Sequence, residues 1–253
     1  MCIRDRLISI TEAWAQFAIA GPNSRNVIRK IVDKEYDISN EGFPFMACGQ
    51  ITVCGGLRAR LFRISFSGEL AYELAVPTRY GDPLMREIMK AGKEFDIVPY
   101  GTEALGVMRI EKGHAAGNEL NGTTSALNLG MVRMVSKKKD SIGSVLSERE
   151  GLNAQDALKL VGFIPVKTDD PVPAGAHLIN TGGPVDAGHD QGYITSACFS
   201  PNLNCHIGIG FLKAGDTRIG EVVRLVSPLT GQDHSVKVVS AHFVDPEGER
   251  LRA

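Results

Sequence analysis

The stretch R-I-S-F-S-G-E-L-A-Y-E, Arg63 to Glu73, predicts a strand, a tight polar turn and a second strand. After the turn, Tyr72, Leu74 and Val76 alternate as one face of the second strand. Glu73 therefore points to the opposite face, where its neighbours are small alanines that leave room beside the carboxylate. Two interpretations fit this pattern, because Glu73 either meets water on the outer face of a sheet or binds a ligand.

The residue types in this stretch indicate what kind of ligand Glu73 could hold. A carboxylate has two acceptor oxygens, which suit a flat ligand edge with two adjacent N–H donors. An aromatic ring such as Phe66 or Tyr72 can cover the face of such a ligand. Each charge-assisted hydrogen bond contributes about 1.5–3 kcal/mol, and a buried carboxylate without a donor costs at least as much. A buried Glu73 should therefore have a donor.

The segments around this stretch predict an α+β domain. Strand, helix, hairpin, strand and helix follow one another, which is typical of a ferredoxin-like layer. The helices are predicted from Gly and Pro at their starts and from apolar residues three and four apart. The predicted elements are a strand from Trp14 to Ala20, a helix from Pro22 to about Val32, hairpin strands Gln50 to Cys54 and Leu57 to Phe66, and a helix with Asp82 as its N-cap.

The second half of the chain predicts a different architecture. A helix begins at Thr102 and stops at Gly113, and an ordered loop anchored by Leu120, Leu127 and Leu129 follows it. Farther on, short strands alternate with turns rich in Gly and Pro, which predicts a small antiparallel β-barrel or jelly-roll-like domain. The predicted strands are Leu160 to Val166, His177 to Ile179, Tyr193 to Phe199, Ile207 to Leu212, Glu221 to Val226 and Val236 to Phe243.

These patterns predict a division of the chain into four parts. Residues 1–6 form a leader that need not be native, and residues 7–136 form the first domain, which is expected to be truncated at its N-terminal side. Residues 137–158 contain three lysines and few large apolar side chains, so they are predicted to be a linker. Residues 159–253 form the barrel domain. The lysines Lys137 to Lys139 are interpreted as a solvated face, although a basic run near a pocket could meet a polyglutamate tail.

The composition argues against several classes of protein. A net charge of -1 over 253 residues is unlike that of nucleic-acid binders, which neutralise phosphates. No apolar run approaches the ~18 residues of a membrane span and no signal peptide is present, so a cytoplasmic protein without membrane contact is predicted. The cysteines form no C-x-x-C pair, so free thiols and no metal site are predicted. Glycine-rich nucleotide loops and the G-x-S-x-G hydrolase motif are absent from the sequence.

Four segments of the chain have counterparts in a known family. They are R-I-S-F-S-G-E-L-A-Y-E, A-I-A-G-P-N-S-R (Ala18 to Arg25), P-Y-G-T-E-A-L-G-V-M-R-I-E-K-G (Pro99 to Gly113), and G-Y-I-T-S (Gly192 to Ser196) with Ser200-Pro201. In this order they resemble the folate-binding aminomethyltransferases of glycine cleavage, from about Ile10 to Leu251. The sequences S-F-S-G-E-L, P-Y-G-T-E, V-S-K-K-K and D-P-E-G-E-R-L are most similar to the C-terminal region of sarcosine oxidase alpha subunits within that family.

The resemblance implies an enzymatic role. In such heterotetrameric oxidases sarcosine is oxidised at a flavin in another subunit, and the released one-carbon unit reaches tetrahydrofolate in this region, giving 5,10-methylenetetrahydrofolate. Tetrahydrofolate is therefore the cofactor expected here, whereas FAD, FMN and NAD are expected only in other regions or subunits. The expected partners are the flavoprotein beta subunit and the gamma and delta subunits.

The resemblance also implies which residues bind folate. Glu73 corresponds to the glutamate that binds the pterin edge, and Phe66 stands at the position of a pterin-site tyrosine. Arg109 corresponds to the arginine of R-x-E-x-G, for which a structural pairing with a carboxylate is an equal alternative. The folate-binding residues implied are Glu73, Phe66, Tyr72, Arg63 and Arg109.

Two departures from the family pattern qualify this expectation. Leu105 stands where the aminomethyltransferases have a folate-binding arginine. The aspartate thought to assist the folate nitrogen has no counterpart before Leu7, so no catalytic residue is expected in the chain, and the chain alone is expected to bind folate weakly and to turn over nothing. The alternatives are a stand-alone glycine-cleavage aminomethyltransferase and a folate-binding or assembly module without chemistry.

Overall fold

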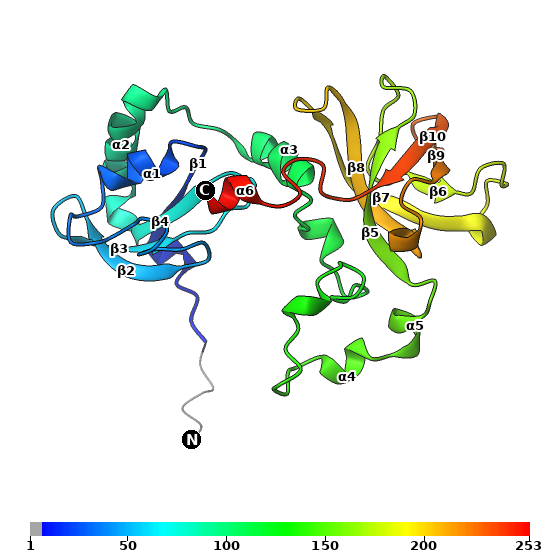
Figure 1. The fold of residues 1–253 in the computed structure, drawn as a ribbon, viewed down its shortest axis with the longest axis horizontal. Helices are drawn as coiled ribbons and strands as arrows, with labels where there is room; N and C mark the ends of the chain where they lie inside the picture. Colours follow the sequence, from blue (N-terminus) through cyan, green and yellow to red (C-terminus); the bar gives the residue numbers. More distant parts are fainter. Residues whose placement is uncertain (1–6) are drawn as a thin grey trace. The chain divides into compact units, whose positions relative to one another are not determined.

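The computed structural model describes residues 7–253, so the leader predicted at residues 1–6 lies outside the described residues. The residues up to Gly101 together with Glu247–Ala253 form one compact unit, and Thr102–Pro246 form the other. Figure 1 shows a sheet with helices in the first unit and a barrel in the second. This confirms the expected α+β class with a closed barrel. The contacts divide the chain at Gly101 and do not test the linker predicted at 137–158, which stays a prediction.

The first unit contains a four-stranded antiparallel sheet in the order β1-β4-β3-β2. The central strand β4 pairs with β1 on one side and with β3 on the other. The stretch Arg63 to Glu73 therefore joins two neighbouring strands of the sheet, as the sequence predicts. The strands are β1 (Trp14–Ala20), β2 (Cys48–Val53), β3 (Leu57–Phe62) and β4 (Ala71–Pro77).

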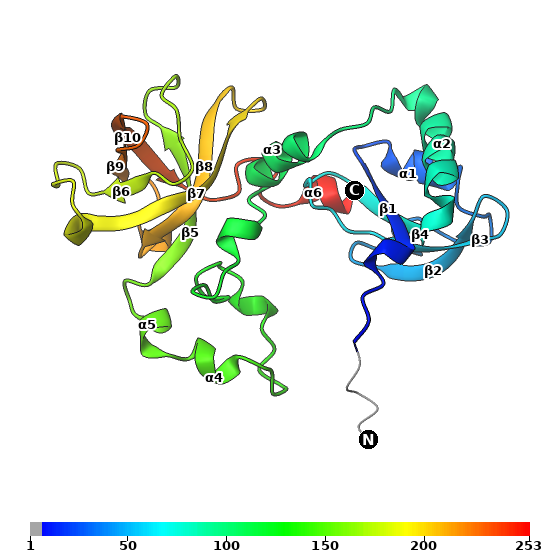
Figure 2. The same cartoon turned by 180° about the vertical axis from the view of Figure 1, so that it is seen from behind.

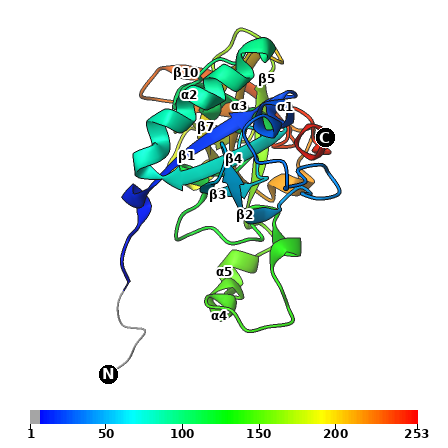
Figure 3. The ribbon, with the colours of Figure 1, turned by 90° about the vertical axis from the view of Figure 1, so that its left-hand side faces the viewer.

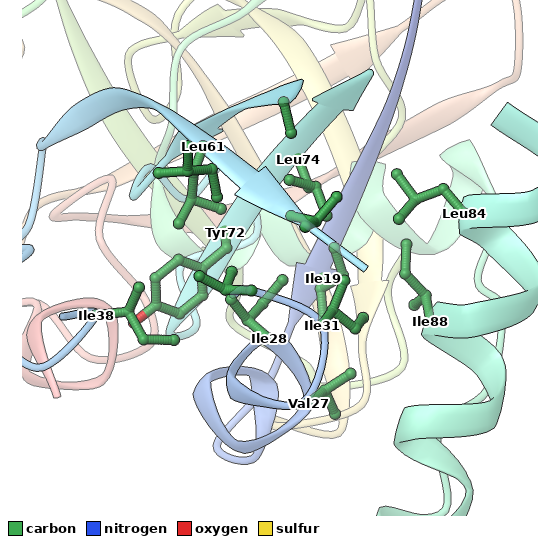
Figure 4. Packing of buried hydrophobic residues seen from close by; sticks show 14 of the residues in the cluster. Ile19, Val27, Ile28, Ile31, Ile38, Leu61, Tyr72, Leu74, Leu84 and Ile88 are labelled. Carbon is green, nitrogen blue, oxygen red and sulfur yellow. The ribbon is translucent and has the colours of Figure 1, made fainter. Parts of the chain in front are cut away.

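The alternation in β4 separates a core face from an outer face. Tyr72, Leu74 and Val76 are fully buried, and two helices cover their side of the sheet. Figure 3 shows α1 (Ser24–Arg29) and α2 (Gly81–Gly92) on the same side of the strands. In Figure 4 the side chains of both helices point toward those of β1, β3 and β4; the labelled residues include Val27, Ile28, Leu84, Ile88, Ile19, Leu61, Tyr72 and Leu74.

The helices differ from the prediction at their ends. The first helix stops at Arg29 rather than near Val32, but the apolar residues of the predicted range, Val27, Ile28, Ile31 and Val32, are all buried. In the second helix Asp82 is not the N-cap, because the helix already begins at Gly81. A Cβ atom at Gly81 would lie 2.8 Å from Ala15 Cβ, so glycine permits the close approach of this helix to β1. Asp82 instead forms an ion pair with Arg86 one turn later.

The second unit contains the helix α3 (Thr102–Lys112) and a closed barrel with the strand order β10-β5-β8-β7-β6-β9. Figure 2 shows the barrel from behind. All six predicted strands are present, with ends that differ by a few residues. They are β5 (Leu158–Pro165), β6 (His177–Ile179), β7 (Asp190–Ser200), β8 (Cys205–Lys213), β9 (Val222–Ser227) and β10 (Gln232–Val239).

The remaining α-helices of the described residues are single turns, α4 (Ser144–Ser147), α5 (Glu150–Asn153) and α6 (Glu249–Arg252). Among residues 7–253, no helix has both the length and the apolar character needed to cross a membrane.

The loop after α3 is ordered, and the polar residue Asn128 attaches it to the barrel. The predicted anchor Leu120 is 53% exposed, whereas Asn128 is buried. Asn128 Nδ2 donates to the Leu158 carbonyl (2.7 Å), and Leu160 N donates back to the Asn128 carbonyl (2.7 Å). The amide therefore attaches the loop to the start of β5.

Gly113 ends α3 in a left-handed conformation with a φ of 79°. A Cβ atom here would lie 2.3 Å from the Ala241 carbonyl oxygen, so a side chain would meet both strain and a backbone clash. Gly106 lies in the interior of the same helix, and a Cβ atom added there would meet nothing among the described residues within 4 Å apart from its chain neighbours and the backbone of its own helix. A side chain is therefore excluded at Gly113 by backbone conformation and close packing, whereas neither constraint applies at Gly106.

We expect Gly113→Ala to lower the free energy of unfolding by about 1–3 kcal/mol or more. Gly106→Ala is the matched control and should raise it by up to about 1 kcal/mol, because alanine is the better helix former. Urea unfolding followed by circular dichroism measures both. Equal effects of the two substitutions would contradict this account of Gly113.

Candidate functional site

The outer face of the sheet is the face opposite α1 and α2, and it carries Glu73. Directly paired residues of antiparallel strands share a face. Ala18 of β1 and Phe62 of β3 lie opposite Glu73, and Gln16 and Arg60 lie opposite Ala75. The inferred position of Glu73 between small residues is therefore confirmed, and an aromatic ring lies next to it on β3.

The carboxylate of Glu73 is half-buried and has one donor within the protein. Gln16 Nε2 donates a hydrogen bond to Glu73 Oε2. Within the described part of the chain, no hydrogen bond to Glu73 Oε1 is found. One oxygen is thus fixed by the neighbouring strand, and the other remains available as an acceptor on the outer face.

Tyr100 and Phe62 complete the surroundings of this carboxylate. Burial, and then the nearby charge of Glu73, raise the pKa of the Tyr100 phenol, so its hydroxyl stays protonated and can donate a hydrogen bond. The ring of Phe62 belongs to the outer face, since Leu61, its neighbour in β3, points into the core. Neither residue was singled out from the sequence, although the inward alternation of Ala59 and Leu61 already places Phe62 outward.

Phe66 lies in the loop between β3 and β4 and is 40% exposed. The loop turns at Gly68, which has a φ of 85°, and Gly68 N donates to Ser65 Oγ at 3.0 Å. This turn presents Phe66 at the surface, so its role as a ligand-contacting ring stays a prediction.

Tyr72 and Arg63 have a different position from the one expected of ligand-binding residues. Tyr72 points to the core face, opposite to Glu73, and its hydroxyl accepts a hydrogen bond from Arg25 Nε at 2.9 Å. A ring on that face cannot cover a ligand held by Glu73. We therefore replace the expected contact of Tyr72 by a supporting role inside the sheet.

Arg63 is 1% exposed and holds main-chain oxygens of the first unit. Nη1 donates to the Phe43 carbonyl (3.0 Å), and Nη2 donates to the oxygens of Arg252 (3.1 Å) and Ala253 (2.8 Å). The guanidinium thus fastens α6 and the loop before β2 to the sheet. Its burial excludes the direct ligand contact that the resemblance implied, because no surface of the side chain is left for a ligand.

Arg109 lies in the second unit, where it pairs with a buried carboxylate. Nη1 donates to Glu119 Oε2 (3.0 Å), and Nη2 donates to Ser196 Oγ (2.7 Å). Ser196 in turn donates to Glu119 Oε1 (2.6 Å), and Ala116 N donates to Oε2 (2.9 Å). Of the two roles open to Arg109, the geometry supports structural pairing with a carboxylate. Leu105 is partly buried on the same helix.

The charge of Glu119 is stabilised by this network. Burial alone would raise its pKa, but the hydrogen bonds, led by that of Ser196, and the charge of Arg109 together lower it below the usual value of 4.5. The carboxylate therefore remains ionised at neutral pH although its side chain is fully buried.

Among residues 7–253, no group of three or more His, Cys, Asp or Glu side chains could hold a metal ion. Four cysteines, Cys48, Cys54, Cys198 and Cys205, are free thiols, while Cys2 lies outside the described residues. Burial and then the charge of Glu111 raise the pKa of Cys198 to about 12, so this thiol is inert as a nucleophile.

The sequence matches two family models in the order of its two architectures. Residues 5–139 match the GCVT N-terminal domain, and residues 159–245 match the glycine cleavage T-protein C-terminal barrel domain. The chain belongs to the glycine cleavage T-protein family. The resemblance of the sequence to this family is thereby confirmed for both the first domain and the barrel domain.

Individual relatives refine the position of the chain within this family. It is 45% identical to "Sarcosine oxidase subunit alpha" of Rhizobium meliloti (strain 1021) over 97% of this chain. It is 40% identical to the protein of the same name from Corynebacterium sp. (strain P-1) over 96% of this chain. In both cases the chain spans only 25% of the relative's length.

A solved structure shows the same fold. It is the glycine cleavage system aminomethyltransferase T from Bartonella henselae, with a TM-score of 0.71 and 21% identity over 92% of this chain and 60% of that one. At this level of identity the likeness extends to the fold alone.

The pairing of Glu119 predicts a pH-dependent contribution to stability. Because its folded pKa is lowered, the contribution is present above the usual value of 4.5 and is lost as the pH falls through the folded pKa. We expect Glu119→Gln to cost about 1–3 kcal/mol of unfolding free energy at pH 7 and progressively less below pH ~4. Chemical unfolding at several pH values measures this difference.

Glu148, which is exposed in the same unit, provides the control substitution Glu148→Gln. It should change the unfolding free energy little at any pH. A loss for Glu119→Gln that is equally large at pH 3 and pH 7 would contradict the proposed role of the charge.

Proposed function

We propose that the chain is the folate-binding, one-carbon-transfer region of a heterotetrameric sarcosine oxidase alpha subunit. The observation that carries the proposal is the available Glu73 oxygen beside Phe62 and Tyr100, in a chain of the T-protein family that is 45% identical to such an alpha subunit. In this role the one-carbon unit derived from the methyl group of sarcosine passes to tetrahydrofolate and gives 5,10-methylenetetrahydrofolate.

The residues on the outer face fit a pterin. A pterin edge offers a ring N–H and an amino group side by side. Glu73 Oε1 is open to one of these donors, and Oε2, which accepts from Gln16, has a second lone pair for the other. Gln16 fixes the carboxylate of Glu73, so the acceptor is oriented before a ligand arrives. Tyr100 can donate a hydrogen bond from its protonated hydroxyl, and Phe62 provides an apolar ring. Phe66 on the adjacent loop is a further ring that we assign to this site.

Tetrahydrofolate, when bound, supplies the nitrogens that accept the one-carbon unit. The protein residues described here bind and orient it, and none of them is assigned a role in proton transfer. Oxidation of sarcosine belongs, in this proposal, to a flavin in the beta subunit. FAD, FMN and NAD are assigned to other regions or subunits, together with contacts to the gamma and delta subunits, and the protein is placed in the cytoplasm.

The alternatives make different predictions about the site. A stand-alone aminomethyltransferase would be expected to have an arginine where this chain has Leu105. An assembly module without a working pterin site would bind tetrahydrofolate no better when Glu73 is intact than when it is removed. The titration below therefore separates a ligand site from a scaffold.

We expect Glu73→Gln to weaken tetrahydrofolate binding about 10- to 100-fold, since one charge-assisted hydrogen bond contributes about 1.5–3 kcal/mol. Isothermal titration calorimetry under reducing conditions measures the dissociation constant. Glu87→Gln on α2 is the matched control, because Glu87 belongs to a helix on the opposite side of the sheet. An unchanged affinity of the Glu73 variant would remove the pterin site from the proposal.

A further inference from the structure

Arg60 and Trp14 form a pair on the outer face of the sheet. The guanidinium carbon of Arg60 lies 3.9 Å from the centroid of the Trp14 ring. The two residues come from β3 and β1, which are separated by β4. Arg60 pairs with Ala75 of β4, and this small residue allows the arginine side chain to cross the central strand. The arginine is thus held over the sheet by stacking.

The guanidinium of Arg60 has no polar partner in the part of the chain that the structure describes: no hydrogen bond or ion pair to it is found among residues 7–253. Two other arginines of the chain differ, since Arg63 binds carbonyls and Arg109 binds a carboxylate. Stacking occupies the flat face of a guanidinium and leaves its N–H groups directed outward in the plane. These donors match the two oxygens of a carboxylate.

The outer face therefore offers two different binding groups. Glu73 supplies an acceptor, and Arg60 supplies a cation with unused donors. The two do not neutralise each other, because the hydrogen-bond donor to Glu73 is Gln16. Small residues, Ala18 and Ala75, lie between them on the strands. A ligand that lies flat on this face needs a donor edge at one end and a negative charge at the other.

The register gives the distance along the sheet between the backbone positions of Glu73 and of Trp14, on whose ring Arg60 lies. Trp14 pairs with Pro77, which is four residues along β4 from Glu73. At the rise of a β-strand this corresponds to about 13 Å between the two positions along the strand. A fused two-ring heterocycle that carries a carboxylate through an aryl linker has this kind of extent, whereas the heterocycle alone does not reach from one group to the other.

We propose that Arg60, held on Trp14, binds the carboxylate end of the ligand whose donor edge Glu73 holds. This inference rests on the proposed function and specifies its ligand as a pterin with an anionic aminobenzoylglutamate tail. Trp14 is a positioning residue, because it orients the guanidinium through its ring. Tetrahydrofolate would thus be recognised at both ends by one face of the sheet.

The experiment compares two probes, tetrahydrofolate and 6-methyltetrahydropterin, which lacks the anionic tail. Calorimetry measures the affinity of the full chain and of three variants for both probes. Arg60→Gln should weaken tetrahydrofolate binding about tenfold and leave the binding of 6-methyltetrahydropterin unchanged. Arg58→Gln is the matched control from the same strand and face, and it should change neither affinity. Glu73→Gln should weaken the binding of both probes.

A second measurement uses salt. Raising the ionic strength should weaken tetrahydrofolate binding by the original chain more than by the Arg60 variant, since salt screens an exposed ion pair. The outcomes are distinguishable. If Arg60→Gln weakens both probes alike or neither of them, the tail site is overturned while the pterin site stands. If Glu73→Gln weakens neither probe, the proposed function itself fails.

Discussion

The pairing of β4 with strands on both of its sides is the constraint on which the first unit depends. A slip of one residue would turn Tyr72 and Leu74 out of the core and bring Glu73 in. Each large apolar side chain buried in the sheet contributes about 1.5–3 kcal/mol, so the core face fixes the register. The same register also fixes the positions of the residues on the outer face, although these residues contribute little to the stability of the register. The position of Glu73 is therefore a consequence of the packing on the opposite side.

Much of the fold follows from local patterns. The period-two alternation in β4 predicts the direction of Glu73, and turns rich in Gly and Pro separate the six barrel strands. The ends of elements were less predictable. The start of α2 depends on the contact of Gly81 with Ala15 of β1, and the loop after α3 depends on the amide of Asn128. Such contacts join residues that are distant in the sequence.

The candidate site was predicted only in part, for the same reason. Glu73 can be found from one strand, but Gln16 and Arg60 reach its face only through the order β1-β4-β3. Tyr100 comes from the loop between α2 and α3, which no strand pattern relates to Glu73. A family motif also does not distinguish residues that touch a ligand from residues that support them. Arg63 stands in the same motif as Glu73, but it is buried and holds the backbone. Both terminal nitrogens of the buried Arg63 have acceptors while its Nε has none within residues 7–253, and the partly buried Arg109 pairs with Glu119, as the cost of desolvating a charge favours.

The return of Glu247–Ala253 to the first unit links its folding to the direction of protein synthesis. Chains grow at about 5–20 residues per second, so residues 102–246 take about 7–30 s to make. During this time the sheet of the first unit has emerged, but Arg63 still lacks its acceptors on Arg252 and Ala253. The first unit is therefore completed only after the whole barrel has been synthesised.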